Sequence, residues 1–95
     1  MKYELPVDYT KIHYTERKHV RRQYELEQDG KCYFCKGKLD ELPPIEIANK
    51  EIDWGLFPNG FMNYPVHLQH CHKTNMTEGA VHAKCNAVMW QYHGR

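Results

Sequence analysis

The stretch VHLQHCHKTNMTEGAVHAKCN, residues 66–86, decides the fold of this chain. Residues 66–70 are expected to form a strand, residues 74–78 a turn region and residues 79–83 a second strand. A final helix is expected over residues 84–93. The pattern therefore predicts a pair of strands followed by a helix.

A metal site ties this stretch to an earlier part of the chain. Cys32 and Cys35 form a CxxC motif, and 46 residues separate Cys35 from His82, which forms HxxC with Cys85. Two such pairs can close tetrahedrally around one zinc ion, because each pair provides two ligands from a single turn. Four protein ligands leave no position for water, so this zinc would stabilise the fold without doing chemistry.

Three further histidines are crowded into residues 67–72, at the end of the first expected strand. Any one of them alone would more often be a structural residue, but core packing hardly explains three so close together. Asn86 directly follows the second zinc pair, in the first turn of the last helix. Because the zinc would join the start of this helix to the distant CxxC, residues 69, 70 and 86 are expected around one pocket.

The length of the chain makes a staple necessary. A domain of 95 residues buries little surface, so a covalent or metal link is expected. The four cysteines could pair as disulfides, but no apolar leader follows Met1, which favours a reducing compartment and metal ligation. No apolar run approaches the roughly 18 residues of a membrane span. We expect one domain, residues 1–95, in the cytoplasm, or in a host cytoplasm if the chain is viral.

One helix is expected in the first third of the chain. Residues 1–14 include Pro6 and are interpreted as an extended arm. Residues 15–29 are rich in helix formers, with Thr15 as the N-cap and Gly30 in the C′ position. This helix leads directly into the first zinc pair.

A zinc knuckle and a long irregular connection follow. The knuckle, residues 32–38, includes Gly37, which can take the positive φ that such a turn usually needs. Residues 39–65 are rich in proline and turn signals, and only residues 45–47 suggest a strand. The aromatic residues of the connection are expected to pack as core rather than to stack on bases: Trp54, Phe57, Phe61 and Tyr64.

The charge of the chain is unevenly distributed although its formal net value is only +1. Residues 1–38 carry nine Lys or Arg against six Asp or Glu, residues 39–53 one against five, and residues 54–95 three against one. A basic cluster on the expected helix could contact phosphates, and a solvated helix face explains it equally well. Its members are Arg17, Lys18, Arg21 and Arg22.

The order of motifs resembles the HNH, or ββα-metal, endonuclease superfamily, and specifically its recombination endonuclease VII-like branch. Three motifs of this chain support the resemblance: the CxxC, His-Cys-His-Lys-Thr at 70–74, and Gly-Ala-Val-His-Ala-Lys-Cys-Asn at 79–86. The usual family pattern at the second and third of these is Asp-His-x-His, then a glycine-rich turn and CxxCN. The match is close over residues 66–93 and loose over 17–93. It implies an α+β fold, a small zinc-stapled ββα-metal domain with an N-terminal helix and a long irregular connection.

The resemblance also implies an activity and roles for single residues. His70 falls on the general base, Asn86 on a ligand of a divalent ion, and His72 on a histidine near the scissile phosphate. His82 takes the place of the first cysteine of the second knuckle. The implied reaction is hydrolysis of DNA phosphodiester bonds to 5′ phosphate and 3′ hydroxyl, with a neutral histidine activating water and Mg²⁺, Mn²⁺ or Ni²⁺ stabilising charge.

One departure from the family pattern affects the ion. Gln69 stands where the family usually has a metal-binding aspartate, and its neutral amide should bind Mg²⁺ more weakly. Three interpretations stay open: the amide ligates nonetheless, a histidine completes the site and favours Mn²⁺ or Ni²⁺, or the activity is impaired. The candidate histidines are His67, His72 and His93.

Other functions stay open beside the nuclease. The chain could be a non-catalytic zinc-containing module that binds nucleic acid, or a protein-binding accessory domain. The first of these gives no reason for His70, His72 and Asn86 to fall in register with a nuclease pocket. In the second, Gln69 would record a lost activity. The nuclease interpretation implies DNA as the partner, no membrane, and a possible homodimer. The resembled junction-resolving enzymes act as dimers but are longer, so a chain of 95 residues could lack the dimerising part. Nicking and double-strand cutting therefore both stay open.

Overall fold

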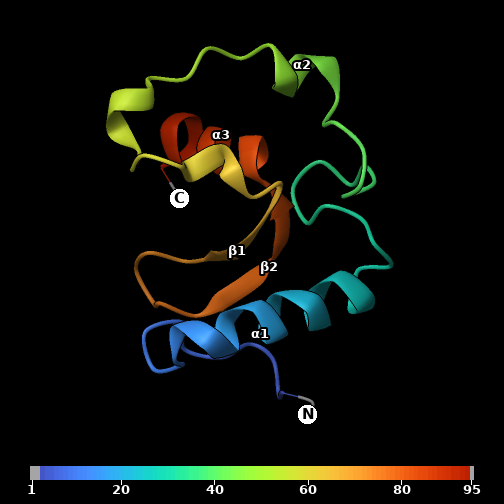
Figure 1. Ribbon diagram of the computed structural model, residues 1–95, viewed down its shortest axis with the longest axis vertical. Helices are drawn as coiled ribbons and strands as arrows, with labels where there is room; N and C mark the ends of the chain where they lie inside the picture. Colours follow the sequence, from blue (N-terminus) through green and yellow to red (C-terminus); the bar gives the residue numbers. More distant parts are fainter. Residues whose placement is uncertain (1–2, 95) are drawn as a thin grey trace.

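The computed structural model describes residues 3–94, which form a small α+β fold with a two-stranded sheet (Figure 1). The α+β class expected from the sequence is confirmed. The hairpin of β1 and β2 lies between α1 and α3, and the connection before β1 runs past α3. In chain order the elements are α1 (Tyr14–Glu27), α2 (Ile45–Ala48), the 3-10 turns η1 (Trp54–Leu56) and η2 (Phe61–Asn63), β1 (Val66–His70), β2 (Thr77–His82) and α3 (Ala83–His93).

The two strands pair antiparallel, from Val66 opposite His82 to His70 opposite Thr77. The register shifts between Gln69 and His70. A bulge of this kind re-aims side chains relative to strict alternation. Here Gln69 is only 2% exposed, whereas His70 is half-buried.

The N-terminal segment, residues 3–13, is bound to the hairpin and is not the extended arm expected over residues 1–14, of which residues 1–2 lie outside the described part of the chain. The Thr77 N–H donates to the Val7 carbonyl at 2.9 Å, and the Val7 N–H donates to Thr77 Oγ1 at 3.0 Å. Asp8 forms an isolated bridge with Met76. The partners of these contacts are far apart in the sequence, so local patterns do not reveal them. β2 begins at Thr77, where it pairs with His70, within the region expected to be a turn.

The first helix begins at Tyr14, and His13 rather than Thr15 is its N-cap. The Thr15 N–H donates to His13 Nδ1 at 3.3 Å, and the His13 N–H donates to the Glu16 carboxylate at 3.1 Å. A histidine ring thus replaces the hydroxyl or carboxylate that usually caps a helix.

The end of α1 also differs from the expectation. Gln28 is the C-cap, and Asp29 occupies the C′ position with a φ of 56°, so Gly30 with a φ of 70° is at C″. The Gly30 N–H donates to the Glu25 carbonyl at 2.8 Å, and the Asp29 N–H to the Leu26 carbonyl at 3.1 Å. This is a Schellman motif in which the two left-handed residues turn the chain toward the zinc knuckle.

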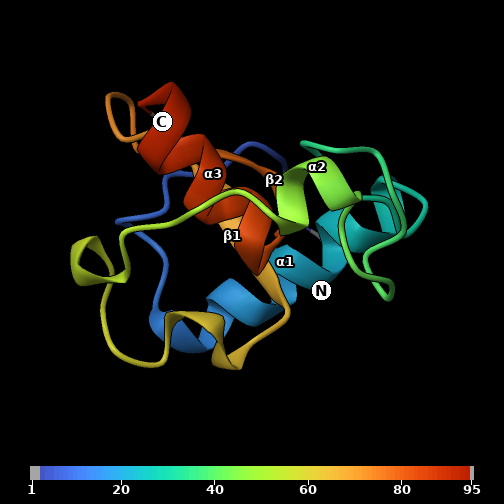
Figure 2. The ribbon, with the colours of Figure 1, turned by 90° about the horizontal axis from the view of Figure 1, so that it is seen from above.

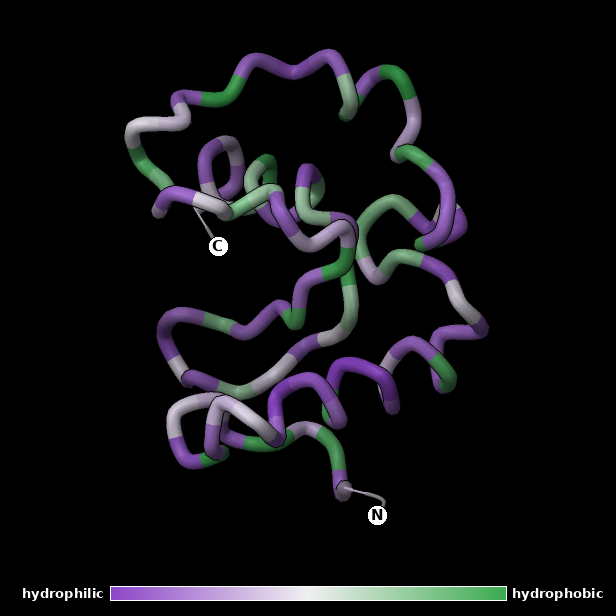
Figure 3. The backbone as a smooth tube through the Cα atoms, in the orientation of Figure 1, coloured by the Kyte–Doolittle hydropathy of each residue, from purple (hydrophilic) through white to green (hydrophobic). Residues whose placement is uncertain are grey.

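The core lies where α1 packs against the hairpin. From α1 only Val20 and Tyr24 are buried, and Figure 3 shows most of the remaining helix as hydrophilic. The Tyr24 hydroxyl and Thr77 Oγ1 share a hydrogen bond of 2.8 Å, which satisfies the phenol inside the core. The other buried members are Cys32, Leu39, Ala80, Val81, Cys85 and Met89.

A glutamine side chain joins α1 to the outer edge of β2. Gln28 Nε2 donates to the Ala80 carbonyl at 2.9 Å, and the Ala80 N–H donates to Gln28 Oε1 at 2.8 Å. The Tyr33 N–H donates to the same carbonyl at 2.9 Å. A Cβ at Gly79 would lie 2.6 Å from Gln28 Oε1 and 2.9 Å from Tyr33 Cβ, so only glycine fits here. This contact holds the zinc knuckle against β2.

The suggested strand at residues 45–47 is wrong, because Ile45–Ala48 forms the helix α2. Pro44 precedes it as the N-cap, and its carbonyl accepts from the Ile47 N–H at 2.9 Å. A proline carbonyl can begin a helix although proline itself has no N–H to donate.

The expectation that the aromatic residues of the connection form core is also wrong. Trp54 is 47% and Tyr64 68% exposed, and Phe57 and Phe61 are half-buried. The connection runs over the surface, because an interior loop would leave backbone groups without partners. Within residues 3–94, no helix is long and apolar enough to cross a membrane.

Candidate functional site

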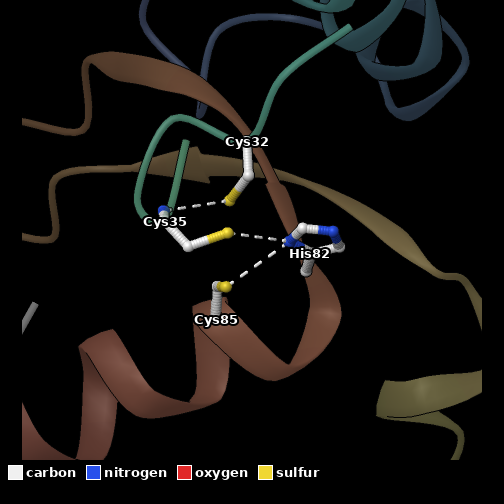
Figure 4. A group of neighbouring side chains, drawn as sticks. All are labelled: Cys32, Cys35, His82 and Cys85. Atoms are coloured by element: carbon white, nitrogen blue, oxygen red, sulfur yellow. Dashed lines mark hydrogen bonds between the residues drawn. The ribbon is translucent and has the colours of Figure 1, made fainter. Parts of the chain in front are cut away.

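Four side chains from three segments converge on one point (Figure 4). Cys32 and Cys35 come from the knuckle, His82 ends β2 and Cys85 lies in the first turn of α3. One ligand atom from each lies within 4.8 Å of all the others. The Cys35 and Cys85 sulfurs lie 3.4 and 3.5 Å from His82 Nδ1. Zinc bonds of about 2.3 Å to sulfur and about 2.0 Å to nitrogen place tetrahedral ligands about 3.6 Å apart. The cluster can therefore hold a structural metal such as zinc.

The ring of His82 is oriented for metal binding by the chain around it. Its Nε2 donates to the carbonyls of Lys38 and Glu41, each at 2.9 Å. Two carbonyl acceptors place the proton on Nε2 and leave the lone pair of Nδ1 facing the sulfurs. Histidine ligands of metals usually have such an outer hydrogen bond.

The knuckle takes its positive φ at a different residue from the one expected. Lys36 has a φ of 67°, and Gly37 is outside the left-handed region. Gly37 contributes its N–H, which donates to the Cys35 sulfur at 3.4 Å, while the Cys35 N–H donates to the Cys32 sulfur at 3.5 Å. Such bonds stabilise thiolates, as a metal site requires.

The three thiols of the cluster compete for negative charge. A hydrogen bond from Cys85 lowers the pKa of Cys32 to about 4. Burial raises the pKa of Cys35, and the hydrogen bond to Cys32 together with burial raises that of Cys85. Three thiolates this close repel one another unless a cation compensates their charge. A divalent metal would allow all three to ionise.

A second site lies apart from the cluster, in a cavity of about 740 Å³ that we call the histidine cavity. Its walls are α1, the N-terminal segment, β1, the connection around η2, and α3. Seen from above in Figure 2, η2 overlaps the first turns of α1, but Figure 1 shows that the two lie at different heights, with η2 beside α3. The predicted site residues that line it are Gln69, His70, His72, Asn86, Arg17, Lys18 and Arg21.

Two residues predicted for the catalytic and DNA-binding site lie outside the lining of this cavity, within the part of the chain described. One is Arg22, which is exposed on α1. The other is His93, whose ring lies 5.6 Å from that of Phe34, beside the knuckle. His93 was expected to share a metal ion with Asn86, but its ring lies beside Phe34 whereas the Asn86 amide contacts His67, so the structure does not bring the two side chains together.

The ring of His70 is held in a row of stacked groups. Tyr9 stacks on it with centroids 4.0 Å apart and planes 10° apart, and the His72 ring lies 4.7 Å away. The Arg17 guanidinium lies 4.0 Å from the Tyr9 centroid. Burial, helped by the charges of His72 and Arg17, lowers the pKa of His70, so this ring is neutral at pH 7.

Tyr9 is the site residue that the sequence did not indicate. Its position depends on the pairing of the N-terminal segment with the hairpin, where the Tyr9 N–H donates to the Asn75 carbonyl at 2.7 Å. No motif or periodicity marks this contact. Arg17 depends on it in turn, because Arg17 Nη2 donates to the Tyr9 carbonyl at 3.5 Å. Arg17 Nε is the one buried side-chain polar atom of residues 3–94 without a hydrogen-bond partner.

His67 lies against Asn86, whose amide nitrogen donates to His67 Nδ1 at 3.0 Å. The His67 ring also hydrogen-bonds the backbone of Phe61 and Tyr64, and burial lowers its pKa, so it is neutral. Of the three candidate histidines, His67 is the one that hydrogen-bonds Asn86 within residues 3–94.

The amide nitrogen of Gln69 is directed elsewhere. It donates to the His70 carbonyl at 3.0 Å and to the Glu78 carboxylate at 3.4 Å. The residue is buried, although it contributes to the wall of the histidine cavity. The side chain that contacts Asn86 is thus the ring of His67, whereas the amide nitrogen of Gln69 contacts His70 and Glu78.

Comparison of the chain with known protein families, curated proteins and solved structures found no match. The resemblance over residues 66–93 accordingly stays an interpretation of the motifs. What the molecule can do has to be inferred from the geometry of the cluster and of the histidine cavity.

Cobalt binding tests the cluster. Metal-free, reduced protein titrated with Co²⁺ should develop the absorption of a tetrahedral thiolate complex that saturates at one equivalent. Cys85→Ser should weaken binding by more than about tenfold, because even an outer partner of a ligand contributes about 10- to 100-fold. Cys71→Ser is the matched control, since Cys71 is the one cysteine outside the cluster. Equal losses in both variants would contradict the assignment.

Proposed function

We propose that this chain is a zinc-stabilised endonuclease of the ββα-metal type that hydrolyses DNA phosphodiester bonds in the histidine cavity. The observation that carries the proposal is the lining of that cavity, where Arg17, Lys18 and Arg21 of α1 meet His70 and Asn86. If the basic side chains of α1 were only a solvated helix face, there would be no reason for them to line the same cavity as His70 and Asn86. Cations that hold phosphates next to a neutral histidine are what phosphodiester hydrolysis needs.

His70 would act as the general base. A phosphodiester resists hydrolysis because water is a poor nucleophile and the transition state accumulates negative charge. The lowered pKa of His70 keeps its ring ready to accept a proton from the attacking water at pH 7. Stacking on Tyr9 fixes the plane of the ring. His72, beside it and exposed, would hydrogen-bond a phosphate oxygen.

Asn86 and His67 would hold the divalent ion. Their donors are an amide oxygen and a neutral ring nitrogen, and rotation of the Asn86 amide would turn its oxygen toward the site. A mixed set of this kind suits Mn²⁺ or Ni²⁺ better than Mg²⁺. The ion would supply positive charge to the phosphate and the leaving 3′ oxygen. The oxygen of Gln69 is the remaining candidate ligand from the family pattern.

The cluster of three cysteines and one histidine has a purely structural part in this proposal. Zinc is the metal that the donor set favours, because structural zinc sites commonly combine cysteine with histidine. Cytoplasmic location and a possible homodimer stay predictions.

A non-catalytic zinc-containing module that binds nucleic acid is the alternative. It is favoured by one observation, that Gln69 stands at the position where a carboxylate would bind a catalytic ion most strongly. The basic wall of the histidine cavity would then bind phosphates without cleavage.

Cleavage of supercoiled plasmid separates the two functions. The zinc-loaded protein should convert plasmid to nicked or linear form, faster with Mn²⁺ or Ni²⁺ than with Mg²⁺. His70→Ala should slow cleavage by about 10²- to 10⁴-fold, the usual contribution of a general base. His93→Ala, a histidine outside the cavity, should cut as the wild type does. No cleavage with any ion by folded protein would favour the binding module.

Salt dependence of DNA binding tests the basic wall. Lys18 lines the histidine cavity, whereas Arg22, on the same helix, does not. Lys18→Ala should therefore reduce the slope of log Kobs against log salt by about 0.9, the value for one lost contact to a duplex phosphate. Arg22→Ala should leave the slope unchanged. Equal changes of the slope in both variants would contradict a specific phosphate contact of Lys18 and would favour the interpretation of the basic cluster as a solvated helix face.

A further inference from the structure

The histidine cavity has an aromatic wall as well as a basic one. Six of the residues that line it are aromatic: Tyr9, Tyr14, Phe57, Phe61, Tyr64 and Trp90. Three of these rings are strongly exposed, with Tyr14 at 72%, Tyr64 at 68% and Trp90 at 41%. Large rings gathered around one concave surface mark a binding site more often than isolated exposed ones do. Contacts to phosphates alone would not require them.

Neighbouring rings hold the aromatic wall in place. The Phe57 ring lies 4.7 Å from that of Phe61 and 5.6 Å from that of Trp90. Phe61 in turn meets the ring of His67 edge-on at 4.6 Å. A ligand that stacks on Trp90 would therefore not first have to order a mobile side chain. The same contacts place the wall next to the histidine and asparagine of the proposed site.

The basic wall lies on α1, whereas Phe57, Phe61, Tyr64 and Trp90 come from the connection and from α3. Lys18 and Arg21 line the cavity from this helix, and Tyr14 adds an exposed ring one turn before Lys18. A ligand in the cavity thus meets positive charge on one side and flat apolar faces on the other. Nucleotides have the matching pair of properties, a charged phosphate and a flat base.

We infer that the histidine cavity binds an unpaired nucleic-acid strand, with bases stacked on Trp90 and Tyr64 and phosphates along Lys18 and Arg21. The face of a base is free for stacking only where the strand is unpaired, because a double helix covers both faces. A volume of about 740 Å³ suits one or two nucleotides, since pockets of roughly 300 to 1,000 Å³ hold small ligands. As a statement about substrate, the inference rests on the proposed nuclease activity, whereas the binding itself does not.

The two tryptophans of the chain provide a direct test. Trp90 lines the cavity, and Trp54, which has a similar exposure of 47%, does not. Trp54→Phe leaves Trp90 as the single reporter of fluorescence, and Trp90→Phe leaves Trp54. Both variants would also have His70→Ala, so that no strand is cut, and would be zinc-loaded without added Mg²⁺ or Mn²⁺. The probes are a 12-nucleotide single-stranded DNA, its duplex, and the same sequence as single-stranded RNA.

Single-stranded DNA should quench the emission of Trp90 and leave that of Trp54 almost unchanged. It should also bind at least about tenfold more tightly than the duplex at equal salt, because each stacked base contributes roughly 5- to 150-fold. Quenching by RNA as well would support the same recognition of an unpaired strand. Duplex binding as tight as that of the single strand, or equal quenching of both tryptophans, would overturn the inference.

The outcome is separable from that of the plasmid experiment. Quenching of Trp90 without any cleavage would support binding of unpaired strands and would contradict the proposed nuclease activity. Cleavage of plasmid without a response of Trp90 to single strands would support the nuclease activity and would contradict the binding of unpaired strands in the cavity. Circular dichroism and Co²⁺ absorption of both tryptophan variants would show that each is folded around its metal.

Discussion

Three sulfurs and one imidazole nitrogen drawn to within 4.8 Å of one another form the constraint on which the rest of the structure depends. His82 ends β2 and Cys85 lies in the first turn of α3, so one metal ion would fix the angle between hairpin and helix. Asn86 is the next residue, and that angle places it against His67 of β1. The cluster thus positions the histidine cavity although it takes no part in the proposed chemistry.

The hydrophobic core alone is small for this task. Many of its members from β2 and α3 are alanine, valine or cysteine, and α1 adds only Val20 and Tyr24. Apolar burial scales with the area removed from water, so side chains of this size contribute little each. Hydrogen bonds at Ala80 and at Thr77 attach the knuckle and the N-terminal segment to the hairpin. The second of these attachments brings Tyr9 onto His70, and so joins the fold to the site.

The sequence was informative where the chemistry is local. The ligands of the cluster follow from the spacing within CxxC and HxxC, and the structure has β1 at residues 66–70, where the sequence predicts a strand. Tyr9 and the exposed aromatic wall could not be predicted, because they depend on contacts across most of the chain and on a connection without periodicity. The predicted caps of α1 were wrong for a local reason. His13 is the N-cap and Asp29 takes the left-handed C′ position, and other residue types are more common at both positions. The catalytic roles of His70 and Asn86 stay predictions.

Whether the metal of the cluster holds the histidine cavity together is measured most directly by the ¹H–¹⁵N spectrum of the protein before and after one equivalent of Zn²⁺. A small core and a cluster of competing thiols predict collapsed amide signals without metal and a dispersed spectrum with it. The signals of Tyr9, His67 and Asn86 should reach their final positions at the same equivalence point. A metal-free protein that already gives the dispersed spectrum, with these three signals unmoved by zinc, would contradict the dependence of the cavity on the cluster.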